Sequence, residues 1–191
     1  MSALPKPHYT LEEYPGLDKN SEARPGYWNG EVFDMSGGSQ EHAEIELNLI
    51  ETLHPRLTRQ GCRMFPANVR IRVPSLPPYR YADLSALCGQ AQFVETGGLD
   101  ALTNPALIIE VLSPSTEAFD RGDKFTSSQS IPDFREYLLV ARHRHHITQL
   151  LRQEDGSWLH REFNSLTDTL TLMTGNCDLS LSEVYRNLSF S

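Results

Sequence analysis

One early stretch of the chain carries apolar side chains at helical spacing. After Ser39, a suitable N-cap, apolar residues recur about every 3.6 positions. Pro55 kinks or ends the predicted helix, and Gly61 marks its limit. The pattern therefore predicts an amphipathic helix between Ser39 and Gly61. Its apolar stripe consists of Ala43, Leu47, Ile50, Leu53 and Leu57.

Most of the remaining chain has patterns typical of β-strands. Asn29-Gly30, between aromatic and β-branched residues, predicts a hairpin over residues 27–35. Asp155-Gly156 predicts a second tight turn. The segments predicted as strands are the run "CRMFPANVRIRV", which alternates over Val69, Ile71 and Val73, and the runs "RYADLSALC", "ALIIEVL", "REYLLVA", "HHITQLLRQ" and "SWLHREF".

Three further helices are predicted from end signals. Thr10 and Glu13 form a capping-box pattern for a short helix. Ser113-Pro114 opens a polar helix that runs to about Ser130, and "LSEVYRNL" forms a short last helix. Because no repeat or low-complexity linker divides the chain, we predict a single α/β domain over residues 1–191, with a mixed central β-sheet flanked by helices.

Composition limits the classes of function. The 191 residues carry a net charge of −8, which argues against a general nucleic-acid coat protein but leaves room for a nuclease with an acidic metal site. The N-terminus has no apolar signal sequence, and no apolar run approaches the roughly 18 residues of a membrane span. Cys62, Cys88 and Cys177 are interpreted as reduced thiols of a cytoplasmic protein.

Glu110 interrupts the apolar run "LIIEVL". A buried carboxylate is costly unless it is paired, hydrogen-bonded or bound to a metal. Two hypotheses follow: Glu110 forms a buried ion pair with Arg70 or Arg72 of a neighbouring strand, or it is a functional group held on a rigid element.

Asp83 gives the functional hypothesis a partner. It lies in the adjacent predicted strand, 27 positions before Glu110 by the numbering. Two converging carboxylates suit a hard cation such as Mg²⁺, whose remaining positions take water and substrate phosphate. Alternatively, Asp83 is an ordinary strand-end carboxylate.

Lys124 is the candidate for orienting or deprotonating an attacking water. The position on the Glu110 strand that shares its face is Leu112, which cannot do this work. Lys124 lies 14 residues after Glu110 and is one of only three lysines, the others being Lys6 and Lys19. Burial would lower its pKa and so suit it to this role. The alternative is a solvated helix lysine paired with Asp120 at i,i+4.

The motifs resemble those of a known family. "NGEVFDMSGGSQEH", "YADLSALC", "NPALIIEVLSPSTEAFDRGDKF" and "IPDFREYLLV" are similar to successive motifs of the Uma-type restriction endonucleases, a branch of the PD-(D/E)XK nuclease superfamily. The resemblance implies a restriction-endonuclease-like core. It implies that Asp83 and Glu110 bind the metal together with the Val111 carbonyl, and that the motif lysine has moved to the helix as Lys124.

The sequence also departs from the family pattern. Ala82 replaces the usual proline before the first aspartate, and Trp28 replaces an acidic residue, although Glu31 is kept. Glu31 is a candidate outer carboxylate. His42 matches a family histidine, and Glu46 could reach the metal from the first helix or face solvent instead.

Two functions follow from these residues. The first is a metal-dependent endonuclease that uses Mg²⁺ or Mn²⁺ to hydrolyse phosphodiester bonds, in DNA, with no membrane association and with a homodimer implied by the resemblance. The second is a non-catalytic interaction module that retains the nuclease fold. The basic run "RHRHH" is predicted to be an exposed edge or turn that could contact phosphate, with a metal site of His143, His145 and His146 as the alternative.

Overall fold

A six-stranded mixed sheet forms the centre of the protein, which we describe from a computed structural model. The structure describes residues 25–28, 31–34, 39–75, 79–96, 98–114 and 116–190. The strand order is β12-β11-β10-β9-β6-β3, and only β9 and β10 run parallel among the neighbouring pairs of this sheet. These strands are β3 (Cys62–Pro66), β6 (Leu84–Cys88), β9 (Leu107–Leu112), β10 (Glu136–Ala141), β11 (Ile147–Arg152) and β12 (Trp158–Phe163).

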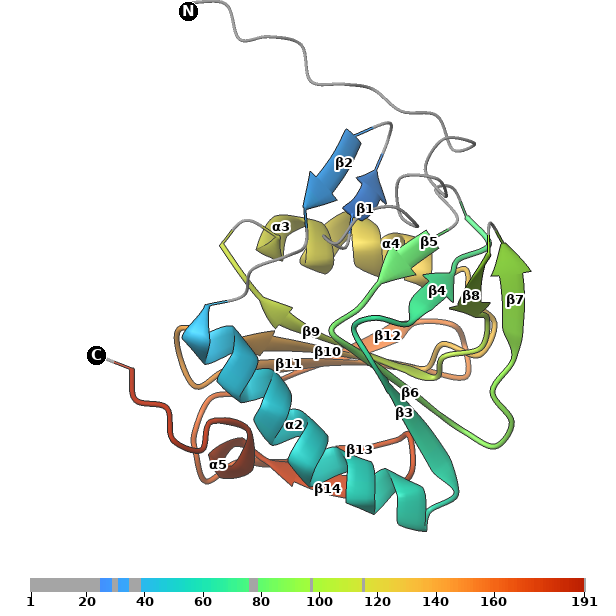
Figure 1. Cartoon of the computed structure of the whole chain (residues 1–191). Coiled ribbons are helices and arrows are strands. Elements are labelled where there is room, and N and C mark those ends of the chain that lie inside the picture. Colours follow the sequence, from blue (N-terminus) through green and yellow to red (C-terminus); the bar gives the residue numbers. More distant parts are fainter. Residues whose placement is uncertain are drawn as a thin grey trace, which may run out of the picture.

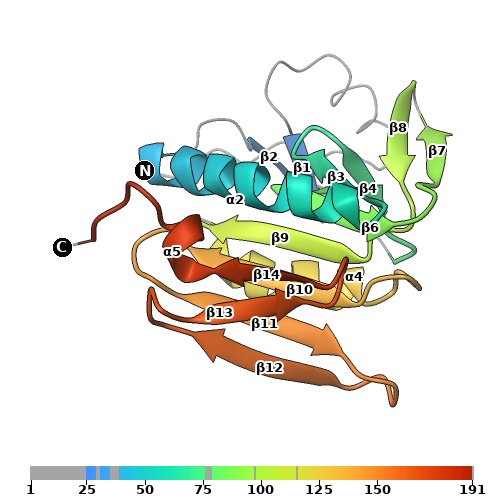
Figure 2. The same cartoon turned by 90° about the horizontal axis from the view of Figure 1, so that it is seen from below.

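The two faces of this sheet are covered differently (Figure 1). On one face lie α2 (Gln40–Arg59), α5 (Leu181–Val184) and the β13–β14 ribbon (Thr169–Leu172 and Cys177–Ser180). On the other lies a helical segment of α3 (Glu117–Phe119), the π-helical turn η1 (Asp120–Lys124) and α4 (Phe125–Ser128). Figure 2 shows α2 lying across the sheet beside β9.

Alternation along β9 decides which face each of its side chains meets. Leu107, Ile109 and Val111 belong to the core under α2, whereas Ile108 and Leu112 belong to the core under the helical segment. By the same period of two, Glu110 points toward the helical segment. The mixed sheet is therefore confirmed, and the fold places Glu110 opposite η1.

The α2 helix confirms the predicted start but not the predicted stripe. The Ser39 side chain accepts a hydrogen bond from the His42 backbone N–H at 3.3 Å, as an N-cap does. The helix continues through Pro55 to Arg59. Ala43 and Leu47 are exposed, so their assignment to the apolar stripe is wrong, whereas Leu53 and Leu57 are buried as predicted. The fully buried row is Ile45, Leu49, Leu53 and Leu57, which are spaced four apart.

Several small strands flank the main sheet. The hairpin of β1 (Pro25–Trp28) and β2 (Glu31–Asp34) is confirmed by antiparallel pairing, and the helix predicted at Thr10 lies outside the described residues. The structure divides the predicted strand "CRMFPANVRIRV" after β3 and the predicted strand "RYADLSALC" at Ala82 and Asp83. A four-stranded sheet has the order β5-β4-β8-β7, with β4 (Arg70–Arg72), β5 (Tyr79–Tyr81), β7 (Phe93–Thr96) and β8 (Leu99–Leu102). The sequence analysis did not predict β7, β8, β13 or β14.

The predicted polar helix after Ser113 is irregular. Ser113 Oγ accepts from the Thr116 N–H at 3.3 Å, and the segment then contains the π-helical turn at Asp120–Lys124. Aromatic packing fixes the segment on the sheet, since the Phe125 ring stacks on that of Tyr137 with 5.4 Å between centroids. Lys124 is thereby held directly above β9.

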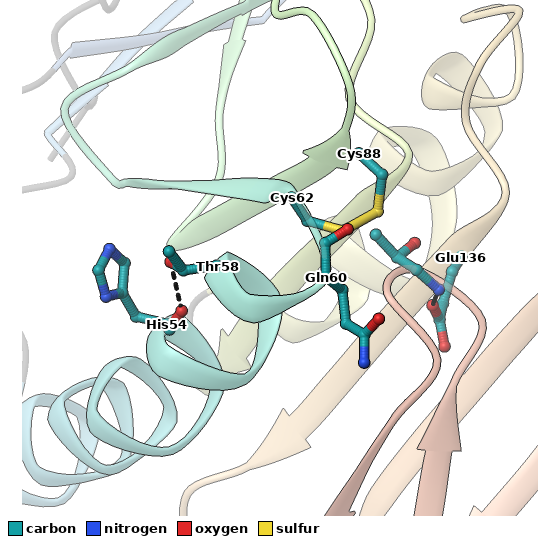
Figure 3. The surroundings of a disulfide bond; sticks show 7 residues. His54, Thr58, Gln60, Cys62, Cys88 and Glu136 are labelled. Carbon is teal, nitrogen blue, oxygen red and sulfur yellow. Dashed lines mark hydrogen bonds between the residues drawn. A yellow bond between two sulfur atoms is a disulfide. The ribbon is translucent and has the colours of Figure 1, made fainter.

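The interpretation of all three cysteines as free thiols is wrong. Cys62 and Cys88 are paired residues of neighbouring strands β3 and β6, and they form a disulfide. The disulfide lies beside the end of α2, where the Thr58 hydroxyl donates to the His54 carbonyl (Figure 3). Cys177 remains a buried free thiol. In the part of the chain that the structure describes, no helix is long and apolar enough to cross a membrane.

Candidate metal centre

Glu110 has one strong partner and one oxygen without any. Its side chain is almost fully buried on β9, with 2% of the residue exposed. Oε2 lies 2.8 Å from Lys124 Nζ. Oε1 is buried and accepts no hydrogen bond from the described residues. Because a buried acceptor without a partner carries a desolvation cost, this oxygen is the atom of the site most in need of a ligand.

Lys124 reaches two carboxylates from η1. In addition to Glu110, its Nζ donates to Asp120 Oδ1 at 3.2 Å, one helical turn earlier. Only 3% of Lys124 is exposed, so the alternative of a solvated helix lysine is wrong, although its pairing with Asp120 is present. The ion-pair partner of Glu110 is therefore Lys124, and not Arg70 or Arg72.

Electrostatics sets the protonation of this pair. Burial alone would lower the pKa of Lys124, but the charges of Glu110, Asp120 and Asp83 outweigh it and raise that pKa above its usual value. The expectation of a lowered pKa for Lys124 is therefore wrong. Burial raises the pKa of Glu110 well above its ordinary range, and the Lys124 charge opposes this shift only in part. Lys124 is an ammonium in this arrangement.

Asp83 meets the same strand at the next residue. Its Oδ2 accepts a hydrogen bond from the Val111 N–H at 2.6 Å, and its Oδ1 lies 3.3 Å from His42 Nε2. The antiparallel register of β6 and β9 pairs Leu84 with Ile109, the neighbours of Asp83 and Glu110. His42 of α2, Asp83 just before β6 and Val111 of β9 are thus brought together at one end of the sheet.

The secondary candidates are placed unequally. The hydrogen bond to Asp83 raises the pKa of His42 against the opposing effect of burial, and the negative charge of Glu46 adds to the increase. Glu46 is half-buried on α2, one turn after His42. Glu31 lies in β2, and the prediction for its side chain falls outside the described residues.

The residues present fit a hard divalent cation that is held only in part by protein. Among the described residues, no three His, Cys, Asp or Glu side chains form a ready metal cluster. Mg²⁺ sites of phosphoryl chemistry commonly use one or two carboxylates, with water and substrate phosphate as the remaining ligands. The partnerless Glu110 Oε1 and the carboxylate of Asp83, bonded to the next residue of β9, match that donor set.

Asp120 also belongs to this buried cluster, although the sequence predicted it only as a surface ion-pair partner of Lys124. It is 3% exposed, and the Tyr137 hydroxyl donates to its backbone carbonyl at 3.0 Å. The sequence signal was the Asp-x-x-x-Lys spacing, which puts both side chains on one helix face but does not say that this face is buried.

The basic run "RHRHH" is only partly an exposed turn. His143 and Arg144 are exposed. His146 is buried, with Nδ1 at 2.6 Å from Asn164 Oδ1 and Nε2 at 3.1 Å from Thr148 Oγ1. The predicted exposure is therefore wrong for His146, which stabilises the start of β11.

The mixed sheet and its acidic end define a protein of the restriction-endonuclease-like class. A crystal structure from Anabaena variabilis, described as "a putative nuclease belonging to DUF820", superposes with a TM-score of 0.74 at 15% identity. The match covers 92% of this chain and 96% of that one. This likeness shows that the two share a fold.

Sequence comparison then gives the family. The model of the Uma2 family, described as "Putative restriction endonuclease", matches residues 11–182, and the chain belongs to this family. Two uncharacterized proteins of Synechocystis sp. are relatives. The first, slr1290, is 30% identical over 98% of this chain and 97% of its own length. The second, sll1609, is 28% identical over 80% of this chain and 86% of its own length.

Proposed function

We propose that the protein is an endonuclease that hydrolyses phosphodiester bonds in DNA with Mg²⁺ or Mn²⁺. The observation that carries the proposal is the environment of Glu110. Its Oε1 is buried without a partner in the part of the chain that the structure describes, while Lys124 lies 2.8 Å from its other oxygen. A purely structural ion pair would gain from satisfying both oxygens. A metal site needs one of them available.

Each residue has a separate task in this proposal. Asp83, Glu110 and the Val111 carbonyl would hold the metal ion, which when bound supplies Lewis-acid polarisation of a phosphoryl oxygen. His42 holds Asp83 in place through its Oδ1. Since the Lys124 pKa is raised, Lys124 acts as an ammonium. It donates hydrogen bonds that orient the attacking water and stabilise the negative charge that develops on the phosphate.

One observation favours the second candidate, a non-catalytic interaction module that retains the fold. The contacts of Lys124 with Glu110 and Asp120 neutralise much of the buried charge without any metal. A chain that had lost its chemistry could keep such a cluster for stability. Metal binding separates the candidates, because the module has no need to bind Mn²⁺ through Glu110.

The test is cleavage of a supercoiled plasmid with Mn²⁺ or Mg²⁺ by the parent protein and by Glu110→Gln. The amide keeps the shape of the side chain but not its charge, so cleavage should be lost in the variant. Cleavage by both proteins at the same rate, or by neither, would count against the proposal. Parallel assays on RNA decide between the two nucleic acids, and sedimentation tests the proposed homodimer.

A cytoplasmic location completes the proposal, because that is where a DNA substrate would be met. Cys62 and Cys88 form a disulfide, and disulfides are rare in cytoplasmic proteins, so this location is proposed from the substrate alone and against the cysteine chemistry.

A further inference from the structure

We propose that Asp120 is a positioning residue that keeps Lys124 paired when Glu110 is engaged by a divalent cation. This inference rests on the proposed function and adds a residue to it. It assigns Asp120 a task through Lys124 and no direct contact with metal or substrate.

The Lys124 ammonium is held by two carboxylates in a buried place. Lys124 Nζ lies between two carboxylates, 2.8 Å from Glu110 Oε2 and 3.2 Å from Asp120 Oδ1. All three residues are nearly inaccessible to solvent, with exposures of 2%, 3% and 3% for Glu110, Asp120 and Lys124. In this structure the ammonium has almost no solvent contact that could replace Glu110, and a buried cation without a partner is strongly unfavourable.

The charge of a bound divalent cation would also act on Lys124. A divalent cation at Glu110 would repel Lys124 and compete with it for the same carboxylate. Asp120 offers the ammonium a partner on its own helical segment, so the contact needs no movement of the sheet. Binding at Glu110 then costs the exchange of one ion pair and not the desolvation of a free charge.

The backbone of Asp120 is held firmly in place. It begins the π-helical turn that ends with Lys124, and such turns often occur at functional sites. The Tyr137 hydroxyl, which is completely buried on β10, donates to the Asp120 backbone carbonyl at 3.0 Å. Because this bond uses the backbone, the side chain can be changed while the turn stays tied to the sheet.

A double-mutant cycle on Mn²⁺ affinity tests the inference, with free Mn²⁺ measured by electron paramagnetic resonance. The proteins are the parent, Asp120→Asn, Lys124→Met and the double variant. Asp120→Asn should weaken Mn²⁺ binding roughly tenfold, the scale of residues that support ligands. In the Lys124→Met background the same change should alter affinity by no more than about twofold, because there is no ammonium left to hold.

The matched control is Glu117→Gln. Glu117 forms an i,i+4 ion pair with Arg121 on the same helical segment, 2.8 Å apart but partly exposed, and its loss should leave Mn²⁺ affinity unchanged. Circular dichroism checks that each variant is folded. Asp120→Ser and Lys124→Gln replace any variant that is not.

The outcomes separate the inference from the proposed function. Equal losses in the two backgrounds would make Asp120 a ligand or a general source of charge and overturn the inference alone. No loss in either background would do the same. A parent protein that does not bind Mn²⁺ would overturn both.

Discussion

Two glutamates are buried in neighbouring central strands, and their surroundings differ. Glu136 begins β10, is fully buried, and accepts three hydrogen bonds: from Gln149 Nε2 at 2.7 Å, the Met173 N–H at 3.2 Å and the Thr174 N–H at 3.0 Å. Glu110, on β9, has a lysine at one oxygen and, among the described residues, no partner at the other.

The difference separates a structural acid from a candidate ligand. Burial raises the pKa of both side chains, so a perturbed pKa does not distinguish them. Satisfaction does. Both Glu136 oxygens are engaged by neutral donors from β11 and from the β13–β14 ribbon, which ties this ribbon to the sheet. Glu110 leaves one acceptor open beside the cation that would stabilise a reacting phosphate.

Loss of the ammonium should have the largest effect. Lys124→Ala should slow plasmid cleavage roughly 10²- to 10³-fold, because one positioned donor to the developing charge is removed. Mn²⁺ should still bind, and Glu136→Gln should cleave at the parent rate. Rates are measured under single-turnover conditions. If Lys124→Ala cut as fast as the parent, the role given to Lys124 would be wrong.

Glu136→Gln should destabilise the fold without touching the metal site. The new amide would turn an N–H₂ group toward donors, leaving them unsatisfied at a cost of about 1 to 3 kcal/mol. Urea unfolding at about pH 5 measures this change. Glu154→Gln, at an exposed position, is the control and should be close to neutral. A Glu136 variant as stable as this control would refute the structural role.

Glu110→Gln should lower stability less than Glu136→Gln in metal-free buffer. Its Oε1 has no hydrogen bond to lose, and Lys124 retains its contact with Asp120. The same urea experiment measures both variants side by side. A loss of about 3 to 5 kcal/mol, typical of breaking a buried ion pair, would instead identify Glu110 as a structural partner of Lys124.

The smallest expected effect is a pH dependence of the Glu136 contribution. Burial raises the pKa of Glu136, opposed by its hydrogen bonds from Thr174, Gln149 and Met173. The native state then binds this proton more tightly than the unfolded state does. The stability that protonated Glu136 contributes is present below its ordinary pKa of 4.5 and is lost as the pH rises through the raised value.

The difference in unfolding free energy between the parent and Glu136→Gln should therefore shrink from about pH 5 toward about pH 8. A difference that grows with pH would mean that the charged form is the favoured one.

The sequence alone could predict the strand order around β9 only in outline. "ALIIEVL" is apolar except for Glu110, so its burial as a strand could be predicted, but not its place in the sheet. The divided helix after Ser113 could not be predicted, because the π-helical turn depends on aromatic packing of Phe125 against β10. Similarly, the buried stripe of α2 contains Ile45 and not Leu47, because apolar residues occur on more than one face of that helix and the sequence does not show which face is buried.

The candidate site was predictable where residue types were unusual. Glu110 stood out inside an apolar strand and Lys124 as a rare lysine. Glu136 did not, because it stands at the beginning of its strand after an arginine, where a charged residue is ordinary. Asp120 was visible only as an i,i+4 partner. That helix face is buried, so the pair of Asp120 and Lys124 is not a surface ion pair. The burial arises from tertiary contacts, which cannot be predicted from a local sequence pattern.

The most direct test of the central claim is a comparison of Mn²⁺ binding by the parent, Glu110→Gln and Glu136→Gln. Isothermal titration calorimetry on the three folded proteins gives the affinities under one buffer condition. Glu110→Gln should bind at least roughly tenfold more weakly than the parent. Glu136→Gln should bind as the parent does. Equal affinities for the parent and Glu110→Gln would contradict the claim that Glu110 is the metal-binding glutamate of the sheet.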